Sequence, residues 1–329
     1  MSNCAPVLLI FFNRPDTLKM TFDAIKKAKP RKLYLAQDGA RKDNENDQKR
    51  ILECRKIVEN IDWDCEVYKN YSEQNNGCGK GPERAINWFF DNEEEGIILE
   101  DDCIASQSFF TYCTEMLKRY RTDDRIFIVT GCNLELQTKD VASSYFFGYA
   151  GTNWGWATWK RNWVKMDYSC EWIKDNYAKS NVQKIISNIN KTAAKAEIQL
   201  FERTNKKITN GENISYWDVQ WQAVRYLNHQ LAIIPQKNLI TNVGLGLHST
   251  HAKMSGIPKN YHSTVGKVNF CYNIKYELGN ELIHPNEIVE NHKYDEKIYK
   301  ALYPNKIKSK IKAIFRKIKS LTSKKEEEC

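Results

Sequence analysis

Three consecutive carboxylates end an apolar segment of the chain. Residues 97–99 read Ile-Ile-Leu, and Glu100, Asp101 and Asp102 follow them directly. Adjacent carboxylates repel one another, so such a cluster at a strand end favours a neutralising cation or ligand. Their oxygens suit Mg²⁺ and Mn²⁺, and these ions in turn favour a diphosphate. The triplet therefore predicts chemistry on a nucleoside diphosphate, with a solvated turn as the plainer alternative.

A glycine-rich loop at residues 77–81 opens a segment that we expect to be helical from Pro82. Lys80 and Arg84 lie near the start of this helix, where the helix dipole favours anions, so either side chain could reach a phosphate. The loop is not a P-loop, because no Ser or Thr follows Lys80. A flexible turn that leads into a helix explains the same residues equally well.

Asp218 is flanked by Trp217 and Trp221 at the start of an apolar segment, residues 215–227, that we expect to be helical. Indole rings around a carboxylate desolvate it, which raises its pKa and suits it to accept a proton. An acid that merely interacts with the helix dipole would occur at the same position. Asp218 is therefore a candidate general base or a helix-terminal acid.

Aromatic residues crowd residues 145–163. Trp156, Trp159 and Trp163 have the spacing of one helical face, which favours core packing. Indole faces also stack on the apolar faces of sugar rings, so Trp154 or Trp156 is a candidate for lining a sugar pocket.

Two histidines lie three residues apart in the glycine-containing segment 244–251. His248 and His251 could ligate a metal, and His251 is the candidate to complete a site at the carboxylate triplet. No H-E-x-x-H pattern indicates a zinc enzyme. We favour a loop that folds over a bound ligand, with a plain surface loop as the alternative.

The first 135 residues alternate apolar strands with helical patterns. Strands without internal alternation, separated by helices, predict a largely parallel sheet covered on both faces. Such sheets bind ligands at the carboxyl ends of their strands, where polar residues recur in this chain. The expected strands are 7–12, 33–36, 66–68, 97–99, 126–130 and 231–234, and the expected helices include 16–28, 106–119 and 215–227.

The composition bounds the class of protein. A chain of 329 residues that is 41% hydrophobic and 28% charged is typical of a soluble globular protein with a sizeable core. It has no apolar run near the roughly 20 residues that span a bilayer and no secretory leader pattern, so we expect a cytoplasmic location. The ten cysteines show no C-x-x-C pairing, which predicts reduced thiols instead of a disulfide framework or zinc site.

Positive charge concentrates at the end of the chain. Residues 305–325 hold nine Lys or Arg and no acid, and with three glutamates after them they leave only +3 of the net +9 to residues 1–304. The body therefore lacks the basic character of a nucleic-acid-binding protein. In this tail, apolar residues recur at helical spacing among lysines, which predicts a basic amphipathic helix on an anionic membrane surface. A disordered tail and a partner-binding helix are the alternatives.

In this order, the motifs resemble those of GT-A-type glycosyltransferases. They are residues 6–14, Gln37-Asp38, Glu100-Asp101-Asp102, Gly155-Trp156, Trp217-Asp218 and the loop 244–251. More narrowly, the chain is similar to the inverting N-acetylglucosaminyltransferase that initiates complex N-glycans and to related bacterial nucleotide-sugar transferases. The resemblance implies an α/β GT-A fold with a mostly parallel central sheet.

The resemblance also implies a division of the chain. The catalytic domain would span residues 1–256, with a nucleotide-binding half at 1–135 and an acceptor half at 145–256 that contains a helical insertion at 170–207. An irregular appendage at 257–304 and the basic tail at 305–329 would follow.

Roles for single residues follow from their positions in the motifs. Arg14 and Asp38 would contact the nucleotide, with Asp38 near the uracil, and Glu100 and Asp101 would hold the ribose and donor sugar. Asp102 would bind Mn²⁺ (or Mg²⁺) that bridges the diphosphate. Asp218 would be the base, although the family's Trp-Asp-Asp-Trp stretch is here one residue longer and lacks the second acid.

The expected activity is metal-dependent, inverting transfer of a sugar from a UDP-sugar to a glycan or lipid-linked glycan. The expected setting is assembly of a bacterial surface polysaccharide or glycolipid, with the protein peripheral on the inner face of the plasma membrane. The alternatives are an inactive carbohydrate-binding or membrane scaffold protein and a sugar-nucleotidyltransferase. The latter would need a glycine-rich signature directly after the first strand, where this chain has Asn13-Arg14-Pro15.

Overall fold

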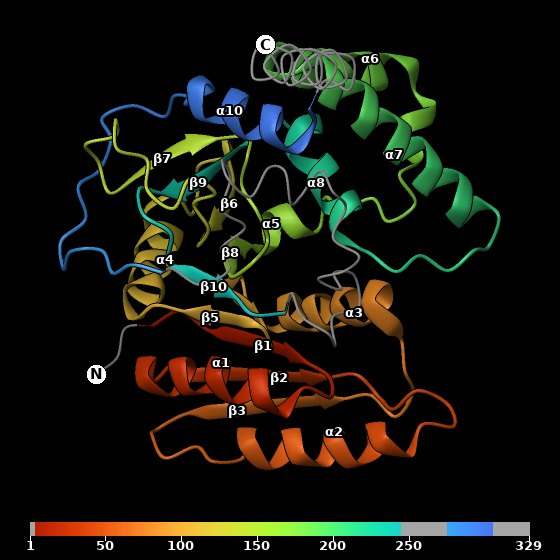
Figure 1. Ribbon diagram of the computed structural model, residues 1–329, viewed down its shortest axis with the longest axis vertical. Coiled ribbons are helices and arrows are strands. Elements are labelled where there is room, and N and C mark those ends of the chain that lie inside the picture. The colour runs from red at the N-terminus through yellow and green to blue at the C-terminus, as the bar shows by residue number, and fades with distance from the viewer. Residues whose placement is uncertain (1–3, 245–274, 305–329) are drawn as a thin grey trace, which may run out of the picture.

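The computed structural model describes residues 4–244 and 275–304, which form an α/β fold around one large mixed sheet (Figure 1). Within these ranges the sheet has eight strands in the order β3-β2-β1-β4-β8-β6-β9-β7. The strands are β1 (Val7–Phe11), β2 (Lys32–Gln37), β3 (Glu66–Tyr71), β4 (Glu95–Glu100), β6 (Ile126–Thr130), β7 (Tyr145–Gly148), β8 (Trp156–Trp159) and β9 (Leu231–Pro235). A second, two-stranded sheet pairs β5 (Cys103–Ala105) with β10 (Ile240–Asn242).

Most neighbouring strands run in the same direction. β1 pairs in parallel with β2 and β4, and β2 with β3. β8 is antiparallel to both β4 and β6, while β9 is parallel to β6 and antiparallel to β7. The sheet is therefore mostly parallel and compatible with a Rossmann-like arrangement, in agreement with the coarse expectation from the strand pattern.

Helices flank the sheet (Figure 1). They are α1 (Pro15–Ala28), α2 (Glu45–Val58), α3 (Gly77–Asn92), α4 (Gln107–Arg119), α5 (Lys160–Trp163), the 3₁₀ helix η1 (Glu171–Lys174), α6 (Asn176–Ile189), α7 (Lys191–Thr209), α8 (Asp218–Leu227) and α10 (His292–Leu302). α1 contacts α2 and α4, whereas α3 contacts β1.

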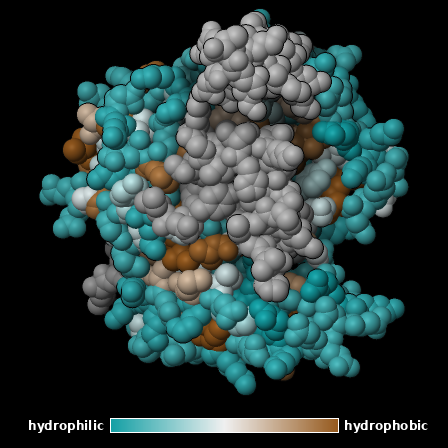
Figure 2. Space-filling model, in the orientation of Figure 1, coloured by the Kyte–Doolittle hydropathy of each residue, from teal (hydrophilic) through white to brown (hydrophobic). Residues whose placement is uncertain are grey.

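The continuous apolar strands are buried because helices cover them. Residues 7–9 of β1 and 97–99 of β4 are fully buried, as parallel central strands require. Phe89 of α3 packs edge-on against Tyr34 of β2, with their ring centroids 5.0 Å apart. The surface in Figure 2 is mostly hydrophilic, with apolar side chains in small patches.

Three local expectations differ from the structure. α3 begins at Gly77, so Pro82 lies inside the helix and not at its first position. Trp156 and Trp159 belong to strand β8, and only residues 160–163 are helical. Residues 292–302 form helix α10, whose Tyr294 and Ile298 are buried, where the sequence suggests an irregular appendage.

The remaining expectations concern cysteines, membrane spans and the C-terminal segments. The eight cysteines in the described ranges are free. No helix in residues 4–244 and 275–304 is long and apolar enough to cross a membrane. The predicted insertion at 170–207 corresponds to η1, α6 and most of α7. His248, His251 and the tail 305–329 lie outside the described residues.

Candidate functional site

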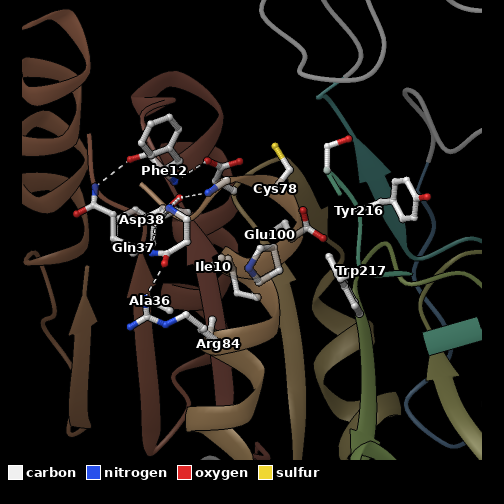
Figure 3. A pocket seen from close by; sticks show the side chains of 18 of the residues that line it. Ile10, Phe12, Ala36, Gln37, Asp38, Cys78, Arg84, Glu100, Tyr216 and Trp217 are labelled. Atoms are coloured by element: carbon white, nitrogen blue, oxygen red, sulfur yellow. Dashed lines mark hydrogen bonds between the residues drawn. The ribbon is translucent and has the colours of Figure 1, made fainter. Parts of the chain in front are cut away.

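A cavity of about 800 Å³ lies at the carboxyl ends of β1, β2 and β4. Two groups of residues form it. The strand wall comprises residues 10–14, 36–38 and 100–102 together with the start of α3. The aromatic wall comprises Asn153, Trp154 and residues 215–219. In Figure 3 the carboxylate of Glu100 points from the strand wall toward Tyr216 and Trp217 of the aromatic wall. The volume is in the range of small-molecule sites.

The carboxylate triplet is fixed by strands on both of its sides. β4 ends at Glu100, and after Asp101 and Asp102 the chain enters β5, which pairs with β10. The backbone N–H of Val243 donates a 2.9 Å hydrogen bond to the carbonyl of Asp102. The two aspartates therefore form a short turn held between the two sheets.

Arg14 bridges the two aspartates of this turn. Its guanidinium forms an ion pair and hydrogen bond with Asp101, and its Nη1 lies 2.9 Å from Oδ2 of Asp102. The Phe12 N–H donates a further hydrogen bond to Asp101 at 3.2 Å. Burial raises the pKa of Asp101 to about 6 even though Arg14 acts to lower it. The predicted nucleotide-contacting Arg14 therefore lies in the cavity but already holds two of the three acids.

Glu100 differs from its two neighbours. Within residues 4–244 and 275–304 its carboxylate has no hydrogen bond or ion pair, although it lines the cavity. Burial, followed by the charges of Asp102 and Asp101, raises the pKa of Glu100 to about 8, and Asp218 contributes in the same direction. Glu100 is thus the acid of the triplet whose oxygens remain available to a ligand.

Asp38 holds the start of α3. Its carboxylate accepts hydrogen bonds from the backbone N–H groups of Asn76 and Gly77 at 2.9 Å, and from the Asn76 amide at 2.8 Å. These are backbone donors that a helix start would otherwise offer to a phosphate. Asp38 lines the cavity as predicted, but it already occupies the anion-binding end of the helix.

The two basic residues near the start of α3, Lys80 and Arg84, lie in different places. Arg84 lines the cavity and donates a 2.7 Å hydrogen bond to Asn76 Oδ1. Lys80 is exposed and lies outside the lining residues. Gly79, its neighbour, explains this orientation: a Cβ there would stand 2.3 Å from the carbonyl oxygen of Ile214, so that side of the helix packs against the segment before α8.

Asp218 is the first residue of α8, where the helix dipole favours a carboxylate. The preceding Trp217 is buried and stacks on Trp156, with their ring centroids 5.9 Å apart. Trp163 and Trp221 complete this cluster, with centroids 4.9 Å apart. Aromatic packing therefore sets the position at which Asp218 enters the cavity.

The predicted sugar-stacking role divides between two tryptophans. Trp156 is only 1% exposed and lies in the cluster behind the cavity, so it supports Trp217 and does not line the cavity. Trp154 lines it. β8 and β4 are antiparallel, and their pairing ends with Ile98 opposite Trp156. Gly155, whose φ is 61°, separates Trp154 from the strand.

The triplet suits a divalent-cation site whose coordination shell is completed by the substrate. It does not suit a site formed by protein ligands alone. In the described part of the chain, no group of three or more His, Cys, Asp or Glu is arranged to hold a metal. Mg²⁺-type sites in nucleotide enzymes often use one or two carboxylates and complete their shell with phosphates and water. Asp102 can supply one such carboxylate. Its Oδ2 contacts Arg14, and a Cβ on Gly244 would stand 2.0 Å from that oxygen.

Several cavity residues were not among the sequence candidates. Arg41 lines the cavity and is fixed by a two-point ion pair to Asp47, whose carboxylate also accepts a 2.7 Å bond from Asn13. Leu200 reaches the cavity from α7, and Asn242 from β10. Asn13 and Asn242 are polar residues at strand ends, a signal that could have identified them. Arg41 and Leu200 carry no such signal.

No model of a known protein family matches the chain, and no curated protein is significantly similar to it.

Proposed function

We propose that this protein is a metal-dependent, inverting glycosyltransferase with a GT-A fold, which transfers a sugar from a UDP-sugar to a glycan hydroxyl. One observation carries the proposal: residues from four separate segments meet in one cavity at the carboxyl edge of the sheet. They are Arg14 after β1, Asp38 after β2, the triplet after β4, and Asp218 at the start of α8.

The donor would lie along the strand wall. Phe12, Asp38 and the start of α3 form the end of the cavity suited to the uridine. Arg14, Arg41 and Arg84 are the cations among the lining residues that could face the diphosphate. Glu100, whose carboxylate has no hydrogen bond within the described ranges, is suited to accept hydrogen bonds from sugar hydroxyls. This arrangement supports a nucleotide-sugar more than a mononucleotide.

Asp102 would hold a divalent cation, Mn²⁺ or Mg²⁺, together with the diphosphate. Such an ion, when bound, supplies Lewis-acid stabilisation of the charge on the leaving diphosphate. Arg14 would then contribute its own positive charge to the phosphates while it keeps Asp101 in place. Both effects favour departure of the nucleotide.

The acceptor would approach along the aromatic wall. Trp154 and Tyr216 offer aromatic faces for sugar rings, and Asp218 would accept the proton of the attacking hydroxyl. Because Glu100 and Asp218 come from opposite walls, a sugar held by the first is exposed to attack on the side of the second. Attack from the side opposite the leaving group inverts the anomeric carbon.

A thermal-shift screen of nucleotide-sugars with and without Mn²⁺, followed by an assay for hydrolysis of the best ligand, tests the proposal. Saturation at about 100 times the dissociation constant adds about 2.7 kcal/mol, enough to raise the melting temperature by several degrees. UMP is the matched control, because it lacks the second phosphate and should stabilise the protein less than UDP.

The outcomes distinguish the proposal from its alternatives. Metal-dependent stabilisation by a UDP-sugar with slow hydrolysis supports a transferase. Stabilisation without any hydrolysis indicates a carbohydrate-binding protein, and no stabilisation by any nucleotide-sugar rejects the site.

A further inference from the structure

The helices α6 and α7 form a pair at the end of the molecule opposite α1 and α2 (Figure 1). Both are amphipathic. Their inward sides carry the buried residues Val182, Ile186 and Ile189 in α6 and Ala193, Ala194, Ile198 and Phe201 in α7. Their outward sides face solvent within the described part of the protein.

The outward side of the pair is basic. Lys184 of α6 and Lys191, Lys195 and Lys206 of α7 are exposed, and none of them forms an ion pair within residues 4–244 and 275–304. In α7 these lysines follow one another at intervals close to whole turns, so they share one side of the helix. The two acids in the pair do not offset them: Glu202 is paired with Lys179, and Glu197 is buried.

The α6–α7 pair carries a net positive charge. Residues 176–209 contain seven Lys or Arg and two Glu, a net charge of +5. Residues 1–304 together carry +3, so the body outside this pair is slightly acidic. Residues 26–42 also carry a net charge of +6, from seven Lys or Arg and one Asp, so the α6–α7 pair is one of several basic stretches in the body.

An exposed aromatic residue lies on the same side. Tyr177 is 78% exposed, and it precedes Lys184 by seven residues, two helical turns. Tyrosine is favoured at the interface between lipid headgroups and water, because its ring is apolar and its hydroxyl is polar. An exposed tyrosine among lysines is a combination suited to a headgroup region.

A second basic segment starts from the same end of the molecule. α10 contacts both α6 and α7, and the described residues end at Pro304, two positions beyond α10. The next 21 residues, 305–325, contain nine Lys or Arg and no acid. A basic stretch of sequence therefore follows directly on a helix that packs against α6 and α7.

We propose that the α6–α7 face, defined by Tyr177, Lys184, Lys191, Lys195 and Lys206, lies against an anionic membrane surface. Polybasic surfaces bind anionic leaflets through the summed attraction of several lysines, which salt screens. Leu200 lines the cavity from the side of α7 opposite Lys191, so in the docked protein α7 lies between the bilayer and the cavity. Membrane docking deepens the proposed function, because it implies a lipid-linked acceptor. The docking itself can be tested without the transferase activity, because vesicle binding needs no nucleotide.

Vesicle co-sedimentation of the full chain tests the proposal. The test variant replaces Lys184, Lys191, Lys195 and Lys206 by Gln, which keeps helix propensity and removes four charges. The control variant makes the same change at Lys27, Lys49, Lys56 and Lys118, exposed lysines on α1, α2 and α4 without ion pairs in the described ranges. The vesicles contain phosphatidylcholine with phosphatidylglycerol, or phosphatidylcholine alone.

On anionic vesicles at low salt, the test variant should partition at least about tenfold more weakly than the control variant, with equal melting temperatures. Neutral vesicles should bind neither protein. Equal binding of the two variants, or equal binding of wild type to anionic and neutral vesicles, overturns the proposal. So does tight binding of the face to a soluble acidic polysaccharide when vesicles fail to bind. UDP-sugar hydrolysis by both variants should equal wild type, so a failure of docking is separate from a failure of the transferase proposal.

Discussion

The strand wall of the cavity holds its charged side chains with ion pairs and hydrogen bonds. On the aromatic wall, ring packing holds Trp217, and a 3.0 Å hydrogen bond to Thr204 adds to the hold on Tyr216. On the strand wall, Arg14 joins Asp101 and Asp102, and Asp38 accepts hydrogen bonds from the start of α3. On the aromatic wall, Trp217 is fixed by its stack on Trp156. The two walls of one site therefore owe their order to different forces.

Because of this difference, the two walls should tolerate different kinds of substitution. A polar network is sensitive to loss of one partner, because the other group is left buried and unpaired. A packed aromatic cluster is sensitive to volume, and its polar atoms matter less: the indole N–H groups of Trp156 and Trp221 find no hydrogen-bond partner among the described residues. Changes in the strand wall should alter donor binding, and changes in the aromatic wall should alter turnover and stability.

Replacing Asp102 by alanine is the most severe test of the strand wall. We expect metal-dependent binding of UDP to disappear, because loss of outer-shell partners alone commonly costs about 10–100-fold and this change removes the ligand itself. Asp101 still pairs with Arg14 in the variant, so the fold should survive. Calorimetry of UDP with and without Mn²⁺ measures the effect, with Asp91→Ala on the exposed side of α3 as control. Unchanged Mn²⁺-dependent binding would refute the role of Asp102.

Asp218→Asn tests the chemistry of the aromatic wall. The amide keeps the shape of the side chain but cannot accept a proton, so turnover should fall by about 10²–10⁴-fold. UDP affinity should stay near wild type, because Asp218 comes from the opposite wall. Steady-state transfer and nucleotide titration measure the two quantities. Turnover close to wild type would remove Asp218 from the mechanism.

Trp217→Ala tests whether packing alone positions the aromatic wall. The residue is 5% exposed, and large-to-small substitutions of buried aromatics cost about 3–5 kcal/mol of unfolding free energy. Because Asp218 follows directly, transfer should weaken while UDP binding at the strand wall persists. Chemical denaturation and UDP calorimetry test this, with Trp217→Phe as the conservative comparison. Equal loss of UDP binding and transfer would show that the walls are not separable.

The sequence predicts the parts of the fold whose stability is local. β6 begins and ends as predicted, at Ile126–Thr130, because five consecutive apolar or β-branched residues suit only a buried strand there. The Trp156–Trp163 segment was harder to predict, since its spacing fits a helix. Pairing of Trp156 and Ala157 between β4 and β6 overrides that periodicity.

The candidate site also contains residues that local sequence predicts and residues that only the folded sheet brings together. Arg14, Asp38 and the triplet could be found because polar residues directly follow apolar strands. The start of α3 at Gly77 could not, because its cap is Asp38, distant in sequence and brought close only by the folded sheet. Sequence spacing likewise does not reveal that Trp154 lines the cavity while Trp156 of β8 is buried behind it.

Asp38→Asn measures how much the Asp38 cap of α3 contributes to stability and to UDP binding at the strand wall. An amide would turn its NH₂ group toward backbone N–H donors of Asn76 and Gly77, so at least one hydrogen bond to a charged acceptor is lost. We expect a loss of about 1–2 kcal/mol in unfolding free energy and weaker UDP binding. Asp64→Asn, an exposed acid before β3, is the control. Loss of stability without any change in UDP affinity would limit Asp38 to a structural role.

The smallest predicted effect concerns pH. Hydrogen bonds from Arg41 hold the pKa of Asp47 below its usual 3.8, with further help from Asn13. The folded protein therefore binds this proton less readily than the unfolded chain, so the stabilisation is complete above pH 3.8 and is lost as the pH falls toward the lowered pKa. Arg41 is 57% exposed, so we expect only about 1 kcal/mol. Denaturation between pH 6 and pH 3 should show a shallower acid decline for Asp47→Asn than for wild type. Parallel declines would mean that this pair does not order the loop between β2 and α2, and that the strand wall depends on Arg14 and Asp38 instead.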